Sequence, residues 1–281
     1  MYNLLSAGFV RLRKSKLFWG LFAAAFLWGA TTCFLIEDSI RTYGEIYLIT
    51  SGGIYLLMPL FYIAPAEAVF CGFFIGTDYS DGTIRNKLFT GHRREHVYLS
   101  NFVISCSAGL MFCAAHLLAM VFVGLPLIGT LILTSVSFPL LRIACSVLIV
   151  ILTSAVFTLL CMLNSNKAAA VTVGMILSFA MIAAGTGVYA KLDQPEFIER
   201  AVIYDEWTVV ESELVPNPRY VSGTARDVLE SAEAILPFSA SLKVMEPGDE
   251  LPPVRVPLCQ AGTTAILTAI GIAAFKRKNI K

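Results

Sequence analysis

Charged side chains are scarce in this sequence. Only 15% of its 281 residues are Asp, Glu, Lys or Arg, whereas 57% are hydrophobic; a soluble domain carries about 25% charged residues. The hydrophobic residues stand in long blocks, a pattern that excludes a single soluble globular domain and indicates several membrane spans. The net charge of +1 says little, because the charges are sorted by region.

The sequence also lacks two motifs of cofactor chemistry. It has seven cysteines but no CxxC pair, and all seven lie in or at the ends of hydrophobic blocks, which argues against a disulfide framework or a zinc knuckle. No Gly-Lys dipeptide occurs, so the phosphate-binding loop G-x-x-x-x-G-K-[ST] is missing. We therefore expect this chain to be no enzyme and to bind no cofactor itself.

Six hydrophobic blocks are long enough to cross a bilayer. The first follows a basic stretch, exceeds a signal-peptide core in length and is followed by no convincing cleavage site, so we interpret it as a span. The predicted fold class is an all-α polytopic membrane protein, with six transmembrane helices and an extracellular loop region between spans five and six. The predicted spans are 17–36, 53–75, 101–125, 140–163, 168–190 and 258–275.

Charge predicts the orientation. Both ends of the chain and the short connections on their side are rich in Lys and Arg, which the positive-inside rule places in the cytoplasm. Residues 191–257 then form the acidic extracellular loop region, and 258–281 form the sixth span and a basic tail. In that loop region, Thr224 to Leu236 is typical of an amphipathic helix capped by Thr224 with Asp227, and 201–210 is typical of a strand.

Two further segments have patterns of their own. Residues 1–16 predict an N-terminal interfacial amphipathic helix with its apolar side toward lipid; a basic topogenic tail is the alternative. The apolar stretch 127–137 is too short to cross the bilayer and predicts a bend or a continuation of its neighbours.

The cytoplasmic segment 76–100, between spans two and three, carries the strongest local signal within 17–190. Asp81-Gly82-Thr83 forms a turn that can begin a helix, and Gly91 can end one. We expect Ile84, Leu88 and Phe89 to share one face of a short helix parallel to the membrane. Such an element suits docking against a cytoplasmic partner.

The segment and its flanks, residues 73–100, read Phe-x-x-Gly-x-Asp-Tyr-x-x-Gly-Thr-Ile-Arg-Asn-Lys-Leu-x-x-Gly-x-x-Arg-x-x-Val-Tyr-Leu-Ser. This residue order resembles the ABC-2-type transporter permease family, the transmembrane subunits of bacterial ABC exporters. The stretch 217–226 and the basic tail 275–281 resemble one bacterial subgroup of that family.

The resemblance implies a multi-pass permease of the bacterial cytoplasmic membrane that forms a homo- or heterodimer. It also implies a separate cytoplasmic ABC ATPase subunit that binds ATP and Mg and drives alternating access. Membrane lipid is the remaining expected partner, and no nucleic acid is expected. By position alone, the turn 164–167 is a second candidate contact. The ATPase-coupling residues implied by the family motif are Asp81, Gly82, Thr83, Ile84, Arg85, Asn86, Lys87, Leu88 and Phe89.

Two other functions remain open. The protein could be a non-transporting membrane sensor or scaffold whose acidic outer loop binds a ligand. His92, Glu95 and His96 also match H-x-x-E-H, a metalloprotease motif, but a third ligand is missing from the cytoplasmic segments and two arginines lie between the histidines.

Glu67 is the one carboxylate well inside a predicted span. An ionisable residue at that depth indicates a functional site, although a hydrogen-bonded structural role is an alternative. The candidate translocation path consists of Phe61, Tyr62, Glu67 and Phe70. In span five, Ala170, Gly174 and Ser178 recur every four residues and predict a close helix contact.

Overall fold

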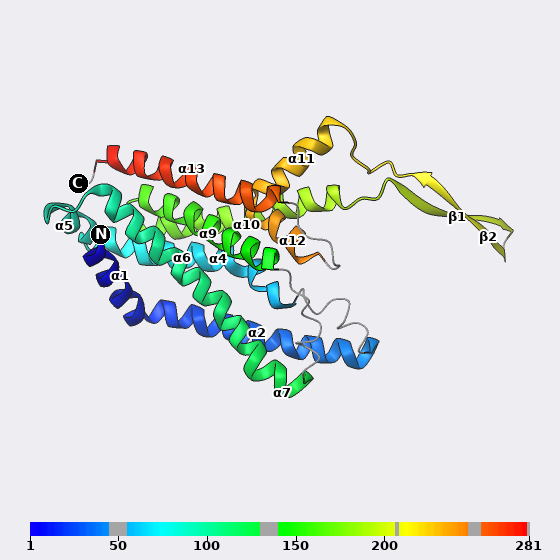
Figure 1. Ribbon diagram of the computed structural model, residues 1–281, viewed down its shortest axis with the longest axis horizontal. Coiled ribbons are helices and arrows are strands. Elements are labelled where there is room, and N and C mark those ends of the chain that lie inside the picture. The colour runs from blue at the N-terminus through cyan, green and yellow to red at the C-terminus, as the bar shows by residue number, and fades with distance from the viewer. Residues whose placement is uncertain (45–54, 130–139, 206–207, 247–253, 280–281) are drawn as a thin grey trace.

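A computed structural model describes residues 1–44, 55–129, 140–205, 208–246 and 254–279 (Figure 1). Six of its helices are long and apolar enough to cross a membrane, which confirms the predicted fold class of an all-α polytopic membrane protein. The spanning helices are α2 (Lys16–Tyr43), α4 (Pro59–Ser80), α6 (Arg94–Ala119), α9 (Leu140–Leu163), α10 (Lys167–Leu192) and α13 (Arg255–Arg277).

Helices α2, α6, α10 and α13 are longer than the predicted spans, α9 has the predicted bounds, and α4 begins and ends later than predicted. Helix α2 continues to Tyr43, and α6 begins at Arg94 and runs on through a π-helical turn, Met120–Gly124, into α7 (Leu125–Ile128). Residues 127–128 therefore continue span three, which agrees with the prediction of a continuation, and Gly129 follows the end of the helix. Residues 130–137 lie outside the described part of the chain. Hydropathy detects only the apolar part of a helix, so polar turns at its ends are missed.

Helix α4 lies at the centre of the bundle and packs closely on α10. A Cβ placed on Gly72 would lie 2.6 Å from Val171 Cγ2, and one on Gly76 would lie 3.0 Å from Lys167 Cα. From the other side, Gly174 faces Ala68 of α4. The small residues predicted to pack against another helix are buried, and this contact with α4 confirms the prediction.

Helix α1 (Tyr2–Lys14) packs on the protein, contrary to the prediction that its apolar side faces lipid. Leu4 and Leu12 are buried in the core, while Phe9 is exposed. A Cβ on Gly8 would lie 2.1 Å from Ile104 Cδ1 of α6, so the missing side chain permits this close approach. The helix itself is confirmed, but its buried stripe contacts α6.

The region between α10 and α13 contains a hairpin and two short helices. Strands β1 (Phe197–Asp205) and β2 (Thr208–Pro216) pair antiparallel and extend away from the bundle (Figure 1). The predicted strand 201–210 falls partly on β1 and partly on β2, and residues 206–207 lie outside the described part of the chain. Helix α11 (Thr224–Ile235) is as predicted, but α12 (Pro237–Met245) was not. The expected capping pair does not form: Gly223 is the N-cap, and no side chain caps the helix.

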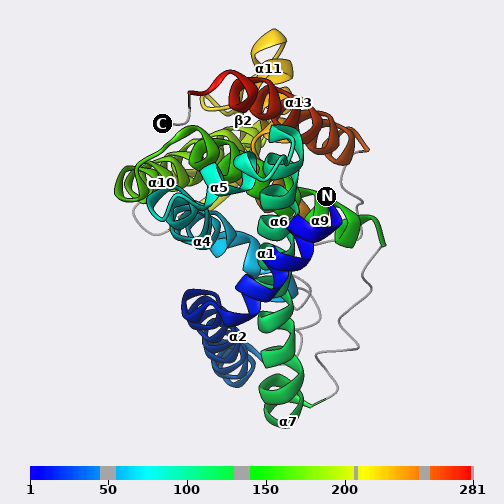
Figure 2. The same cartoon turned by 90° about the vertical axis from the view of Figure 1, so that its left-hand side faces the viewer.

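Both ends of the described chain lie at one end of the bundle, beside α5 (Thr83–Phe89) (Figures 1 and 2). The hairpin lies at the opposite end. An even number of spanning helices produces this arrangement.

Candidate functional site

Helix α5 lies between α4 and α6, and only residues 81–93 of the predicted segment 76–100 lie outside those two helices. Gly82 begins α5 with φ of 69°, a left-handed conformation that favours glycine. Ile84 is fully buried and Leu88 is half-buried, whereas Phe89 is 81% exposed. The prediction that all three share one face is wrong for Phe89, because five residues on a helix turn its side chain about 140° away from Ile84.

Asp78, in the last turn of α4, holds α5 in place. Its side chain is buried and forms ion pairs with Arg11 of α1 and with Lys87 of α5, the latter at 2.8 Å. Arg11 also donates to the carbonyl of Phe74, and its guanidinium carbon lies 3.9 Å from the centre of the Phe74 ring. We call Arg11, Asp78 and Lys87 the Asp78 cluster.

The C-terminal end of α13 is fixed to the same end of the bundle. Lys278 Nζ donates to Tyr79 Oη at 2.9 Å and to the carbonyl of Met162 at 3.0 Å, which joins the tail to α4 and α9. Partial burial lowers the pKa of Lys278 to about 8. Arg94 donates to the carbonyls of Phe275 at 3.0 Å and of Lys278 at 2.5 Å.

Two hollows near the end of α4 share Ser80, and the first of them reaches α5. One is lined by residues from Asp78 to Arg85, and the other by Phe73 and the start of α10 around Lys167. The α9–α10 turn, residues 164–167, belongs to the second hollow, and Asn166 caps α10 by accepting from the amide of Ala168 at 2.9 Å. The predicted second contact therefore borders the same surface as α5.

The histidines of the H-x-x-E-H motif do not share a helix. Helix α6 begins at Arg94, so His92 precedes it while His96 lies in its first turn. Glu95 forms an ion pair with Lys276 at 2.5 Å. Within the described part of the chain, no group of three His, Cys, Asp or Glu side chains is placed to hold a metal ion.

Three of the four predicted path residues, Tyr62, Glu67 and Phe70, face α6, whereas Phe61 faces α12. Phe61 packs edge-on against Phe238 of α12. Tyr62 donates to the carbonyl of Phe112 at 3.3 Å, and Phe70 packs on the Phe112 ring. Glu67 faces α6 and α9. None of these four residues lines the apolar cavity described next.

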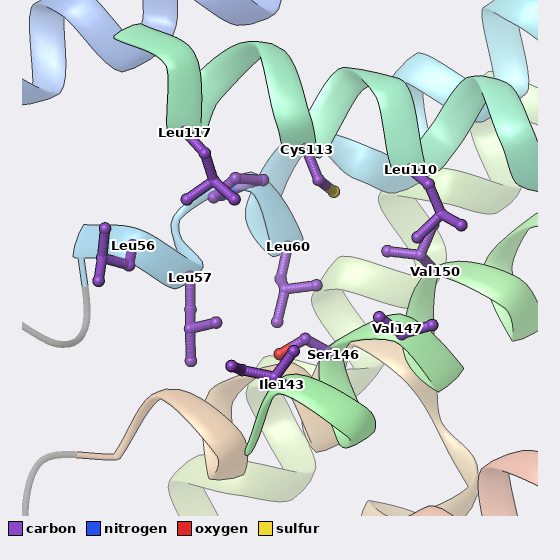
Figure 3. A pocket seen from close by; sticks show the side chains of 11 residues that line it. Leu56, Leu57, Leu60, Leu110, Cys113, Leu117, Ile143, Ser146, Val147 and Val150 are labelled. Carbon is purple, nitrogen blue, oxygen red and sulfur yellow. The ribbon is translucent and has the colours of Figure 1, made fainter. Parts of the chain in front are cut away.

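An apolar cavity of about 250 Å³ lies elsewhere, between the start of α4, the middle of α6 and the first half of α9 (Figure 3). Side chains from all three segments point into it, and Ser146 supplies its one hydroxyl. No charged side chain lines it. The lining residues are Leu56, Leu57, Pro59, Leu60, Leu110, Cys113, Leu117, Ile143, Ser146, Val147 and Val150.

Glu67 lies just behind the wall of this cavity. A Cβ on Gly109 would lie 2.4 Å from Glu67 Oε1 and 2.9 Å from Cγ1 of Val150, a cavity-lining residue. Glu67 is fully buried, and the thiol of Cys71 lies 3.2 Å from its Oε2. Its Oε1 has no hydrogen-bond partner of ordinary geometry in the described structure, although Ser154 lies beside the carboxyl group.

Sequence reasoning missed the Asp78 cluster and the cavity. Asp78 carries a usable signal, because an acidic residue in the last turn of a helix opposes the helix dipole and calls for a nearby cation. The cavity has no such signal, since its lining residues are ordinary span residues.

Neither the known protein families nor the curated proteins give any match to this chain.

Proposed function

We propose that this protein is the transmembrane permease subunit of a bacterial ATP-driven ABC exporter and that α5 seats in a separate cytoplasmic ATPase. The observation that carries the proposal is that α5 is anchored on one face and exposed on the other. Its inner face is anchored through Ile84 and the Asp78 cluster, while Phe89 projects outward with 81% of its surface exposed. An anchored helix that presents one aromatic side chain has the form of a docking element.

The surroundings of α5 support the same role. Helix α5 is connected through Asp78 to α1 and α4, so a force on α5 reaches a spanning helix directly. The turn at 164–167 borders the same surface and offers the ATPase a second contact. The family resemblance adds the rest of the proposal: ATP and Mg on the partner, a second permease subunit in a homo- or heterodimer, both termini in the cytoplasm, and export by alternating access.

Co-purification with the ATPase tests the docking role. We expect a cytoplasmic P-loop ATPase of the same cell to co-purify with the wild-type chain, and Phe89→Ala to weaken the association by about tenfold or more, as loss of an aromatic anchor does. Phe34→Ala is the matched control, because Phe34 is also exposed, at 56%, but lies on the spanning helix α2. Equal association of both variants with the ATPase would remove the basis of the proposal.

One observation favours the sensor function as a second candidate. A charged pocket of about 270 Å³ lies between α10, α11, α12 and the start of α13, on the side of the hairpin. Glu230 accepts from Arg226 at 3.1 Å and from Arg255 at 2.7 Å at its edge, which lowers the pKa of Glu230. A chain that binds a ligand in this pocket and associates with no ATPase would be a sensor.

A further inference from the structure

We propose that Glu67 and the apolar cavity form one binding site for an amphiphilic cation, with the ammonium group at the carboxylate and the hydrocarbon chain in the cavity. If the protein is an exporter, as proposed above, this amphiphilic cation is the class of substrate that it exports, and only that step rests on the proposed function. Binding itself is a property of this chain alone.

One oxygen of the carboxylate, Oε1, accepts no hydrogen bond of ordinary geometry in the described structure, although the Ser154 hydroxyl lies beside the carboxyl group. Glu67 is fully buried, Cys71 reaches only Oε2, and no Lys, Arg or His of the described chain lies within ion-pair distance of it. Burying a carboxyl oxygen without a partner is unfavourable, and a cation that also donates a hydrogen bond relieves that cost. An ammonium group supplies both the charge and the donor.

The cavity and the carboxylate are near neighbours. Val150 lines the cavity, and its Cγ1 lies against the same empty position beside Gly109 that Glu67 Oε1 approaches. One valine side chain and one glycine therefore stand between the two parts of the site. Because Gly109 has no side chain, the Val150 side chain is the group that must move for a ligand to reach from the cavity to the carboxylate.

The cavity accepts an uncharged chain and no second charge. Its lining residues on α6 and α9 each extend over eight residues, from Leu110 to Leu117 and from Ile143 to Val150, which is about 10 Å along a helix. Among the described residues no charged side chain lines it, so a ligand with charges at both ends is unfavourable there. The ligand class is therefore a single cationic head on a chain about 10 Å long.

Photolabelling of the purified chain in lipid nanodiscs tests this site. The probe is a decylamine with a diazirine at the end of its chain, and mass spectrometry locates the label. We expect the label in the peptides that contain residues 56–60, 110–117 and 143–150. We also expect decylammonium to displace the probe at about tenfold lower concentration than decanol, because only the amine pairs with Glu67.

Two variants separate the parts of the site. In Glu67→Gln the preference for decylammonium over decanol falls to near one. Leu60→Trp fills the cavity and removes the label, whereas Ile176→Trp, on an exposed position of α10, leaves it unchanged. Equal displacement by the two ligands on the wild-type chain overturns the proposal without any variant, and so does labelling that survives Leu60→Trp. Neither result depends on the ATPase, so each is distinct from a failure of the docking role.

Discussion

Replacing Asp78 by Asn removes the one negative charge that joins α1, α4 and α5. The change leaves Arg11 and Lys87 without their carboxylate partner. Breaking a fully buried ion pair costs about 3–5 kcal/mol, because the remaining charge stays buried. Here the two cationic side chains are 32% and 22% exposed and can turn toward water. We therefore expect a smaller loss, about 1–3 kcal/mol, concentrated in the anchoring of α5.

Hydrogen exchange measures this loss directly. If α5 opens locally, a change of about 1–3 kcal/mol accelerates exchange of the amides in 81–93 by about 5- to 150-fold. Peptide mass spectrometry of the protein in nanodiscs reads that segment separately from the spans. We expect exchange in α9 to stay unchanged, since within the described residues no member of the Asp78 cluster forms a hydrogen bond or ion pair with α9.

The matched control is Glu37→Gln. Glu37 pairs with Arg41 four residues later on α2, and the arginine side chain is 75% exposed. An exposed pair of this kind contributes about 0.5 kcal/mol or less, so we expect no effect on α5. If Asp78→Asn changes exchange in 81–93 by less than twofold, the buried carboxylate does not anchor α5, and the inferred connection between docking helix and span is wrong.

Three further outcomes follow from other contacts. Gly271→Ala places a Cβ 2.0 Å from the hydroxyl of the buried Tyr98, so we expect the thermal midpoint to fall by about 2 to 10 °C, whereas Gly262→Ala, with nothing within 4 Å, leaves it unchanged. Burial raises the pKa of Glu233, so its ionisation lowers stability as pH rises; Glu233→Gln should therefore melt above the wild type at pH 8, with the gap closing near pH 4. Because the pKa of Lys278 is about 8, acetylation of that amine in the folded protein should rise with a midpoint near pH 8, measured by mass spectrometry.

The spans were predictable because the bilayer fixes their length and composition. A run of about twenty apolar residues has one stable structure in hydrocarbon, a helix, so hydropathy alone locates the six helices. Hydropathy does not predict where these helices end. Arg94 to Ser100 continue α6 as polar and mixed residues, and their helical state depends on contacts such as that of Arg94 with the end of α13.

Helix α5 was predictable from its turn residues, but its anchoring was not. Gly82 and Gly91 mark its limits locally. Asp78 finds Arg11 across 67 positions of sequence, and no local pattern specifies that pairing. The site around Glu67 is harder still, because it depends on the register between α4 and α6 that places Gly109 opposite the carboxylate.

The packing around α4 indicates where the bundle can open. Gly72 and Gly76 bring α4 into close contact with α10. We therefore expect α4 and α10 to move together as one rigid unit. On the opposite side, Glu67 meets α6 and α9 with an unsatisfied oxygen, a weaker contact. Asp78 stands eleven residues from Glu67 on the same helix, about 16 Å along its axis. A force on α5 is therefore expected to shift α4 with α10 and to separate the interface at Glu67, where the cavity already begins.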